Sequence, residues 1–179
     1  MAGKSQRRRQ NAQRFMASLV EHLERAQPGD DVRAFLEAMQ EWLLQNMRRF
    51  TEQDRDACGL QRYATMQLAQ LPTMYAEFDP VFELSRMTEP PVDSIGQVAS
   101  SIGRWFWEAI TVWAEQDCPQ CESGMRILQE QGNPLRLAYE CDVCTWVEQE
   151  GRTAWPEGVR IEPATTEALR RRGLLLRSV

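Results

Sequence analysis

Four of the five cysteines form two matched CxxC pairs, and this spacing constrains the fold more than any other feature of the chain. The pairs are Cys118 with Cys121 and Cys141 with Cys144, and nineteen residues lie between them. A CxxC pair can turn both sulfurs toward one point, so two pairs supply the four thiolates of a tetrahedral metal site. Four protein ligands leave no position for water or substrate. The sequence therefore predicts a structural metal and not a catalytic one.

The residues favour Zn²⁺ as the bound ion, held at about 2.3 Å from each sulfur. Iron in a four-thiolate site stays a second option, because ligand type alone does not separate the two metals. Two disulfides are the alternative for a secreted chain, but the paired spacing favours thiolate ligation in a reducing compartment. We therefore expect one structural zinc ion and a cytoplasmic protein.

The composition is that of a globular protein, with 42% hydrophobic and 26% charged residues. No apolar run approaches the roughly 18 residues that a membrane span needs, so no membrane association is expected. Residues 1–14 lack the apolar stretch of a secretory signal. The same residues are Arg-rich and free of acids, so a mitochondrial transit peptide stays an alternative to a helix that continues from them.

The charge is distributed unevenly around a net charge of −5. Residues 1–14 carry five basic groups and no acid, whereas residues 117–150 carry seven acidic and two basic groups. Four thiolates around one divalent ion make this second segment still more negative, so it should repel nucleic-acid phosphates. Only the basic ends, with Arg7–Arg9 and Arg170–Arg172, could contact them. We therefore expect nucleic acid to be a less favoured partner than a protein.

Apolar residues recur at helical spacing through residues 1–116 and predict a helical bundle. The expected helices cover about 5–26, 32–50, 51–71 and 95–116. Thr51 to Asp54 is typical of a capping box, whereas Gly59 weakens the third helix. Residues 72–92 contain four prolines and allow a short helix or a packed loop at 81–84. The last helix opens at a second capping box, Ser94 to Gln97, and is rich in tryptophan.

The C-terminal part of the chain has a strand pattern. Segments 125–129 and 135–140 predict a hairpin with Gly132-Asn133-Pro134 as its turn, and segment 145–147 predicts a third strand. After Gly151 we expect an extension whose short helix is capped by Thr165 or Thr166 and ends at Gly173.

Residues 117–150 resemble a zinc ribbon, through a CPxC knuckle, Gly124 close behind it, a β-hairpin and a second CxxC. The resemblance implies that the four cysteines hold one structural zinc ion. Many ribbons place glycine directly after each knuckle, where this chain has Glu122 and Thr145. The resemblance covers under a fifth of the chain, and it is specific for the metal and not for a function.

The expected fold is mainly α with a small β zinc ribbon, an α+β class. Its parts are a helical domain (1–116) that ends in the Trp-rich helix, the ribbon (117–150), and an extension (151–179) whose short helix packs back.

No catalytic set is recognisable in the sequence. The single histidine, His22, lies in the first helix without a serine or cysteine motif. Cys58 is the unpaired cysteine, and the negative charge of Asp54 and Asp56 should raise its thiol pKa, which is the wrong direction for a nucleophile. We therefore expect that the protein is not an enzyme.

Three of the six tryptophans, Trp42, Trp105 and Trp113, fall on apolar helix stripes and are expected in the core. Trp107, Trp146 and Trp155 lack an inward assignment, so they are candidate partner-binding residues, with a core position as the alternative. In size and acidity the chain resembles bacterial immunity proteins that neutralise a cognate toxin.

From these observations we expect a non-catalytic protein-binding protein, such as an immunity protein or an inhibitor that acts through an acidic surface. A nucleic-acid-associated or regulatory zinc-ribbon protein is the alternative. The sequence does not predict the oligomeric state.

Overall fold

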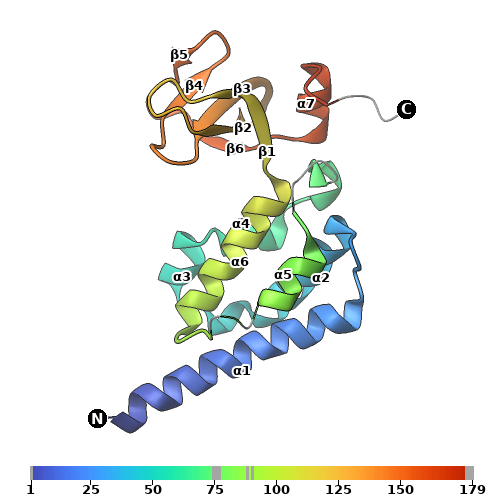
Figure 1. The fold of residues 1–179 in the computed structure, drawn as a ribbon, viewed down its shortest axis with the longest axis vertical. Helices are drawn as coiled ribbons and strands as arrows, with labels where there is room; N and C mark the ends of the chain where they lie inside the picture. Colours follow the sequence, from blue (N-terminus) through green and yellow to red (C-terminus); the bar gives the residue numbers. More distant parts are fainter. Residues whose placement is uncertain (1, 74–77, 88, 90, 176–179) are drawn as a thin grey trace. The chain divides into compact units, whose positions relative to one another are not determined.

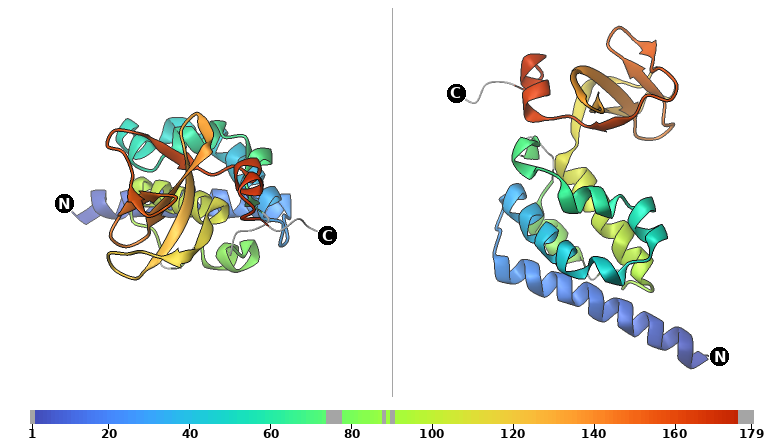
Figure 2. Two further views of the ribbon diagram at one scale, coloured as in Figure 1. Left: turned by 90° about the horizontal axis from the view of Figure 1, so that it is seen from above. Right: turned by 180° about the vertical axis from the view of Figure 1, so that it is seen from behind.

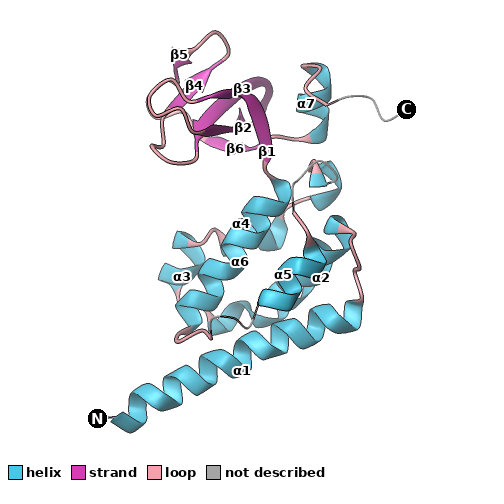
Figure 3. Cartoon of the chain, in the orientation of Figure 1, coloured by secondary structure: helices cyan, strands magenta, loops and turns pink. Residues whose placement is uncertain are grey.

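The computed structural model describes residues 2–73, 78–87, 89 and 91–175 of the chain. These residues form two compact units, the first from residues 2–68 and 78–109, the second from residues 69–73 and 110–175. Figure 3 shows helices throughout the first unit and strands in the second. The α+β class predicted from the sequence is therefore confirmed. No helix in the described part of the chain is long and apolar enough to cross a membrane.

The first unit consists of helices joined by short connections (Figure 1). They are α1 (Ala2–Ala26), α2 (Val32–Asn46), the 3-10 helix η1 (Met47–Arg49), α3 (Glu52–Ala57), α4 (Leu60–Thr65), α5 (Pro80–Arg86) and α6 (Ile95–Ile110, shared at its end with the second unit); a further 3-10 turn, η2, covers Leu68–Gln70. The helix allowed by the sequence at 81–84 is thus present as α5, and residues 74–77, 88 and 90 of the segment 72–92 lie outside the described residues.

Side-chain caps and one glycine set the helix ends. The Thr51 hydroxyl accepts a hydrogen bond from Asp54 N while the Asp54 carboxylate accepts one from Thr51 N, so the predicted capping box is confirmed. The prediction of one helix over 51–71 is wrong. Gly59 has φ = +64°, a left-handed conformation that ends α3 and starts α4.

Aromatic side chains form much of the core of the first unit. The ring of Phe15 lies 4.8 Å from Trp42 and 5.4 Å from Phe50, centroid to centroid. Tyr63 and Phe106 stack with an interplanar angle of 8°. The contact of Phe15 with Trp42 joins α1 to α2, and the stacked pair joins α4 to α6. The apolar stripes predicted from the sequence therefore face one another within these pairs.

The prediction that the Trp-rich helix runs to residue 116 is wrong. Helix α6 ends at Ile110, and strand β1 (Val112–Asp117) follows at once. Along β1 burial alternates, with Val112 buried and Trp113 42% exposed, so Trp113 is not a core residue. A β-branched and an aromatic residue both favour the strand, where Val112 pairs with Ile127 of the neighbouring strand.

The second unit contains an antiparallel sheet in the order β1-β2-β3-β4-β5, with β6 also paired to β2. Its further strands are β2 (Gly124–Glu130), β3 (Asn133–Cys141), β4 (Val147–Gln149), β5 (Thr153–Ala154) and β6 (Ile161–Pro163). The β2–β3 hairpin was predicted, but its turn is Gln131-Gly132, and Asn133 and Pro134 already belong to β3. The predicted strand 145–147 begins two residues later, because Thr145 has φ = +58°.

The segment after Gly151 is part of the same sheet and of the same core. Helix α7 (Thr166–Arg171) is capped by the Thr165 hydroxyl, which is one of the two caps that the sequence allowed. Gly173, with φ = +69°, follows the end of the helix. Ala168 and Leu169 of α7 are buried with Val112, Ile127 and Leu137 of the sheet. The predicted short helix therefore does pack back onto the hairpin.

Candidate metal centre

Two tight turns of the second unit carry the four cysteines. Cys118 follows β1 directly and shares a turn with Cys121, while Cys141 is the last residue of β3 and shares the next turn with Cys144. Strands β2 and β3 pair in register with Met125 opposite Cys141, and this pairing brings the two turns to the same end of the hairpin.

The four sulfurs lie close enough to bind one ion. All four Sγ atoms are within 4.8 Å of one another, and the pairs Cys118–Cys144 and Cys121–Cys141 are 3.5 and 3.4 Å apart. In a tetrahedral site with bonds of about 2.3 Å, neighbouring sulfurs are about 3.8 Å apart. The geometry therefore fits a four-coordinate metal ion. Among the residues that the structure describes, no other group of metal-ligating side chains is this close.

The backbone of each turn points hydrogen-bond donors at the sulfurs. Gln120 N lies 3.4 Å from the Cys118 sulfur, and Val143 N and Cys144 N lie 3.4 Å from the Cys141 sulfur. These donors stabilise a negatively charged sulfur and fix the direction of its lone pairs.

The two turns are alike in their backbone hydrogen bonds. Cys118 N donates to Ser123 O, and Cys141 N donates to Trp146 O, in both cases five residues ahead and at 2.8 Å. Glu122 and Thr145, the residues directly after each knuckle, have φ values of +59° and +58°. Both non-glycine residues thus adopt the left-handed conformation that glycine supplies in many ribbons.

The inner side of the cluster is apolar. Cys118 and Cys141 are buried together with Met125, and Ala114, Tyr139 and Trp146 pack against this group. Cys121 and Cys144 are exposed. The low-polarity side limits water access to two of the sulfurs, which strengthens their bonds to a cation.

The pKa values of the thiols show how a cation would stabilise the cluster. Hydrogen bonds with the side chain and then the backbone of Ser123 lower the pKa of Cys121 to about 6. The backbone N–H of Cys144 lowers the pKa of Cys141. The pKa of Cys144 is raised to about 12: its backbone hydrogen bond at Trp146 lowers it, but partial desolvation and the hydrogen bonds of the neighbouring thiols raise it more. A divalent cation replaces the shared protons and removes the repulsion between thiolates.

The three tryptophans predicted as partner-binding candidates all have intramolecular contacts. Trp107 is half-buried on α6 with the Arg62 guanidinium 5.9 Å from its ring. Trp146 donates from Nε1 to the fully buried Glu148 carboxylate. Whether any of the three contacts a partner stays a prediction.

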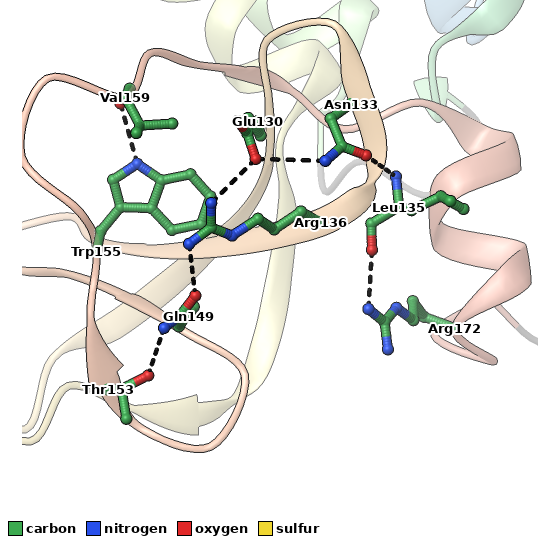
Figure 4. Close-up of polar contacts among 9 residues, drawn as sticks. All are labelled: Glu130, Asn133, Leu135, Arg136, Gln149, Thr153, Trp155, Val159 and Arg172. Atoms are coloured by element: carbon green, nitrogen blue, oxygen red, sulfur yellow. Dashed lines mark hydrogen bonds and ion pairs between the residues drawn. The ribbon is translucent and has the colours of Figure 1, made fainter.

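Trp155 belongs to a polar network on the sheet, drawn in Figure 4. Its Nε1 donates to Val159 O at 3.0 Å, and the Arg136 guanidinium lies 4.7 Å from its ring centroid. Arg136 also donates to Glu130 and Gln149, so it links β3 with β2 and β4. These contacts give Trp155 a structural role.

The most exposed tryptophan is one that sequence reasoning placed in the core. Trp113 is 42% exposed on β1, and its ring lies against the backbone of Gly124, where an added Cβ would be 3.4 Å from the ring. The strand-like alternation of Val112, Ala114 and Gln116 with Trp113, Glu115 and Asp117 is the signal that could have revealed this.

The two other titratable candidates, His22 and Cys58, belong to the first unit, whereas the cysteine cluster belongs to the second. His22 is half-buried on α1, with Nε2 3.8 Å from a Glu41 carboxylate oxygen. Burial, and then the Asp54 carboxylate, raises the pKa of the Cys58 thiol. The predicted direction of that pKa shift is confirmed.

Comparison of the chain with protein families, with characterised proteins and with solved structures found no match.

Proposed function

We propose that this is a non-catalytic, protein-binding protein whose second unit is stabilised by one structural zinc ion. The sulfur-only ligand set supports zinc, because Zn²⁺ has no redox chemistry and commonly occupies closed four-cysteine sites. With four protein sulfurs on one ion, the centre offers no position for a substrate. Its contribution is then to the stability of the ribbon.

Metal analysis of freshly purified, tag-free protein tests the zinc assignment. We expect one zinc per chain, retained in Cys58→Ser and lost in Cys141→Ser. Stoichiometric iron in place of zinc would contradict the choice of ion. Absence of any stoichiometric metal from the unsubstituted protein would contradict the site itself.

The observation that carries the binding proposal is a surface beside the second knuckle, here called the Trp113 surface: Trp113, Arg126, Asp142 and Val143. The Arg126 guanidinium lies 5.6 Å from the Trp113 ring centroid and forms an ion pair with Asp142. Val143, next to Asp142, is 68% exposed. Tryptophan and arginine are the residues most enriched at the energetic centres of protein interfaces.

Acidic side chains follow Trp113 along the same strand. Glu115 and Asp117 of β1 are exposed, as Trp113 is, and the register with β2 shifts between Trp113 and Asp117. Glu122, at the end of the first knuckle, is also exposed. An exposed tryptophan and valine beside acidic side chains fit a basic protein partner, such as a toxin that the protein neutralises.

Affinity capture from native cells tests the binding proposal with a matched pair of variants. Leu135 is 57% exposed on β3 and serves as the control position for Trp113. We expect one basic protein in stoichiometric amount with the unsubstituted chain and with Leu135→Ser, and at least tenfold less with Trp113→Ser. Equal capture by both variants would contradict the role of the Trp113 surface. Stoichiometric nucleic acid in place of a protein would favour the alternative of a nucleic-acid-associated ribbon protein.

A further inference from the structure

The N-terminal part of α1 buries no side chain between Lys4 and Asn11. Every residue from Lys4 to Asn11 is exposed, and the first buried residue of the helix is Ala12. In Figure 2 this part of α1 extends past the other helices of the first unit. Most of the helix surface of residues 4–11 is therefore open to a ligand, apart from the contacts of Arg9 with Asp93 and of Asn11 with Arg49.

This open segment is strongly basic. Lys4, Arg7, Arg8 and Arg14, with Gln10 and Asn11 between them, line one hollow on the helix. Their spacing of three, four and seven residues places the basic groups along one side of α1. The first turn of α1 contains no acidic residue. The positive end of the helix dipole adds to the same potential.

One basic residue of the segment points elsewhere. Arg9 pairs with Asp93 at 2.7 Å, and both side chains are more than half exposed. Such a pair orients the helix against the segment before α6 without neutralising Lys4, Arg7, Arg8 or Arg14. Four cationic side chains thus stay available to an anion.

We propose that residues 4–14 of α1 bind duplex DNA, with the helix in the major groove and Lys4, Arg7, Arg8 and Arg14 on the phosphates. An α-helix with its side chains is about 10–12 Å wide, and the major groove of B-DNA is about 12 Å wide. Residues 4–14 span about 15 Å along the axis, so nearly three helical turns can lie in the groove. The amide of Gln10 matches the donors and acceptors of base edges. Asn11 Oδ1 already accepts a hydrogen bond from Arg49 at 3.4 Å, so it holds the end of the segment against the first unit.

The chemistry of the segment favours DNA over the other polyanions. Residues 4–11 contain no large apolar side chain, whereas the centre of a protein interface is rich in such residues. Protein–DNA interfaces are polar and strongly basic, as this segment is. The deep, narrow major groove of duplex RNA does not admit a helix. This inference concerns the first unit, so it does not depend on the Trp113 surface or on the metal.

A binding titration with a labelled 20-base-pair DNA of mixed sequence tests the proposal, using the full-length metal-loaded protein. The test variant is Arg7→Gln/Arg8→Gln, and the matched control is Arg170→Gln/Arg171→Gln on α7, which removes the same charge from the other basic cluster. Glutamine is a good helix former, and circular dichroism checks that both variants keep their helices. A duplex RNA of the same sequence and a polyglutamate chain serve as competing ligands.

We expect the dissociation constant for DNA to rise at least tenfold in the Arg7/Arg8 variant and less than threefold in the control. Four phosphate contacts predict a slope of log K against log salt near −3.6, which should fall to about −1.8 when two contacts are removed. The RNA duplex should bind at least fivefold more weakly than DNA. No binding in 50 mM salt, or equal loss in both variants, would overturn the proposal. Tighter binding of polyglutamate than of DNA would assign the segment to an acidic protein partner instead.

Discussion

Glu122 and Thr145 hold the backbone of the two knuckles in a conformation that costs a residue with a side chain about 1–2 kcal/mol. Threonine is the less favourable of the two, because its branched Cβ crowds the left-handed conformation further. The cost is tolerated because each turn is fixed on both sides by hydrogen bonds, from Cys118 N to Ser123 O and from Cys141 N to Trp146 O. The positions of the cysteines thus depend on the backbone hydrogen bonds of the two turns. The side chains of Glu122 and Thr145 disfavour the backbone conformation that these turns require.

Replacing Thr145 by glycine should therefore stabilise the second unit. We expect Thr145→Gly to raise the free energy of unfolding of the metal-loaded protein by about 0.5–1 kcal/mol. Relief of the backbone strain stabilises the folded protein, and the greater conformational freedom of glycine in the unfolded chain offsets part of this gain. Denaturant unfolding monitored by metal release measures the change. Thr145→Ala is the control, since it removes the branch but keeps a Cβ at positive φ. A gain from alanine as large as that from glycine would show that the backbone conformation is not the cause.

At the scale of helices and strands, one close approach positions α6. A Cβ built on Gly103 would lie 2.7 Å from the carbonyl oxygen of Cys58, closer than the two atoms can stand. Gly59, at φ = +64°, follows Cys58 and turns the chain into α4, whose Tyr63 stacks on Phe106 of α6. The packing of α4 and α6 thus depends on Gly103 at the contact with Cys58 and on Gly59 at the turn before α4.

Gly103→Ala should destabilise the first unit even though alanine is the better helix former. We expect a loss of about 2 kcal/mol, because the added methyl group forces α6 away from the backbone at Cys58. Thermal unfolding monitored by circular dichroism measures it. Ser100→Ala, at an exposed position of the same helix, should change stability by no more than about 0.5 kcal/mol. A neutral effect of Gly103→Ala would mean that α6 can move without loss of packing.

At the scale of the whole molecule, the four clustered cysteines and the chain after residue 150 belong to one compact unit. Strand β6 pairs with β2, and Gln129 of β2 accepts hydrogen bonds from the Thr165 backbone and hydroxyl while donating to Glu162. The helices α1 to α5 supply no ligand to the cysteine cluster. Loss of the metal should therefore act on the second unit first.

Removal of the metal by a strong chelator provides the test. We expect amide hydrogen exchange in β2 and β3 to accelerate by at least a hundredfold, since structural zinc in small modules is worth on the order of 10 kcal/mol. Exchange in α1 and α2 should change less than threefold. Cys141→Ser without chelator should reproduce the pattern, whereas Cys58→Ser should not. Unchanged exchange in β2 and β3 after metal removal would contradict a structural role for the ion.

Sequence patterns predicted much of the fold because their causes are local. The paired CxxC spacing located the four sulfurs that the structure brings within 4.8 Å of one another, and helical periodicity located α1 and α2. Capping chemistry predicted the start of α3 at Thr51 and the start of α7 at Thr165 or Thr166, of which Thr165 is the cap. Such features depend on residues a few positions apart, so a single sequence contains them.

Tertiary structure decided what depends on distant partners. Residues 111–116 fit a helix wheel, but pairing of Val112 with Ile127 makes them a strand, and this turns Trp113 outward. The contact that requires glycine at position 103 comes from Cys58, forty-five residues earlier in the chain. Local chemistry thus determined the cysteine cluster and most helices of this protein, whereas the exposed tryptophan and the extent of the sheet in the second unit were decided by pairing energies between segments far apart in sequence.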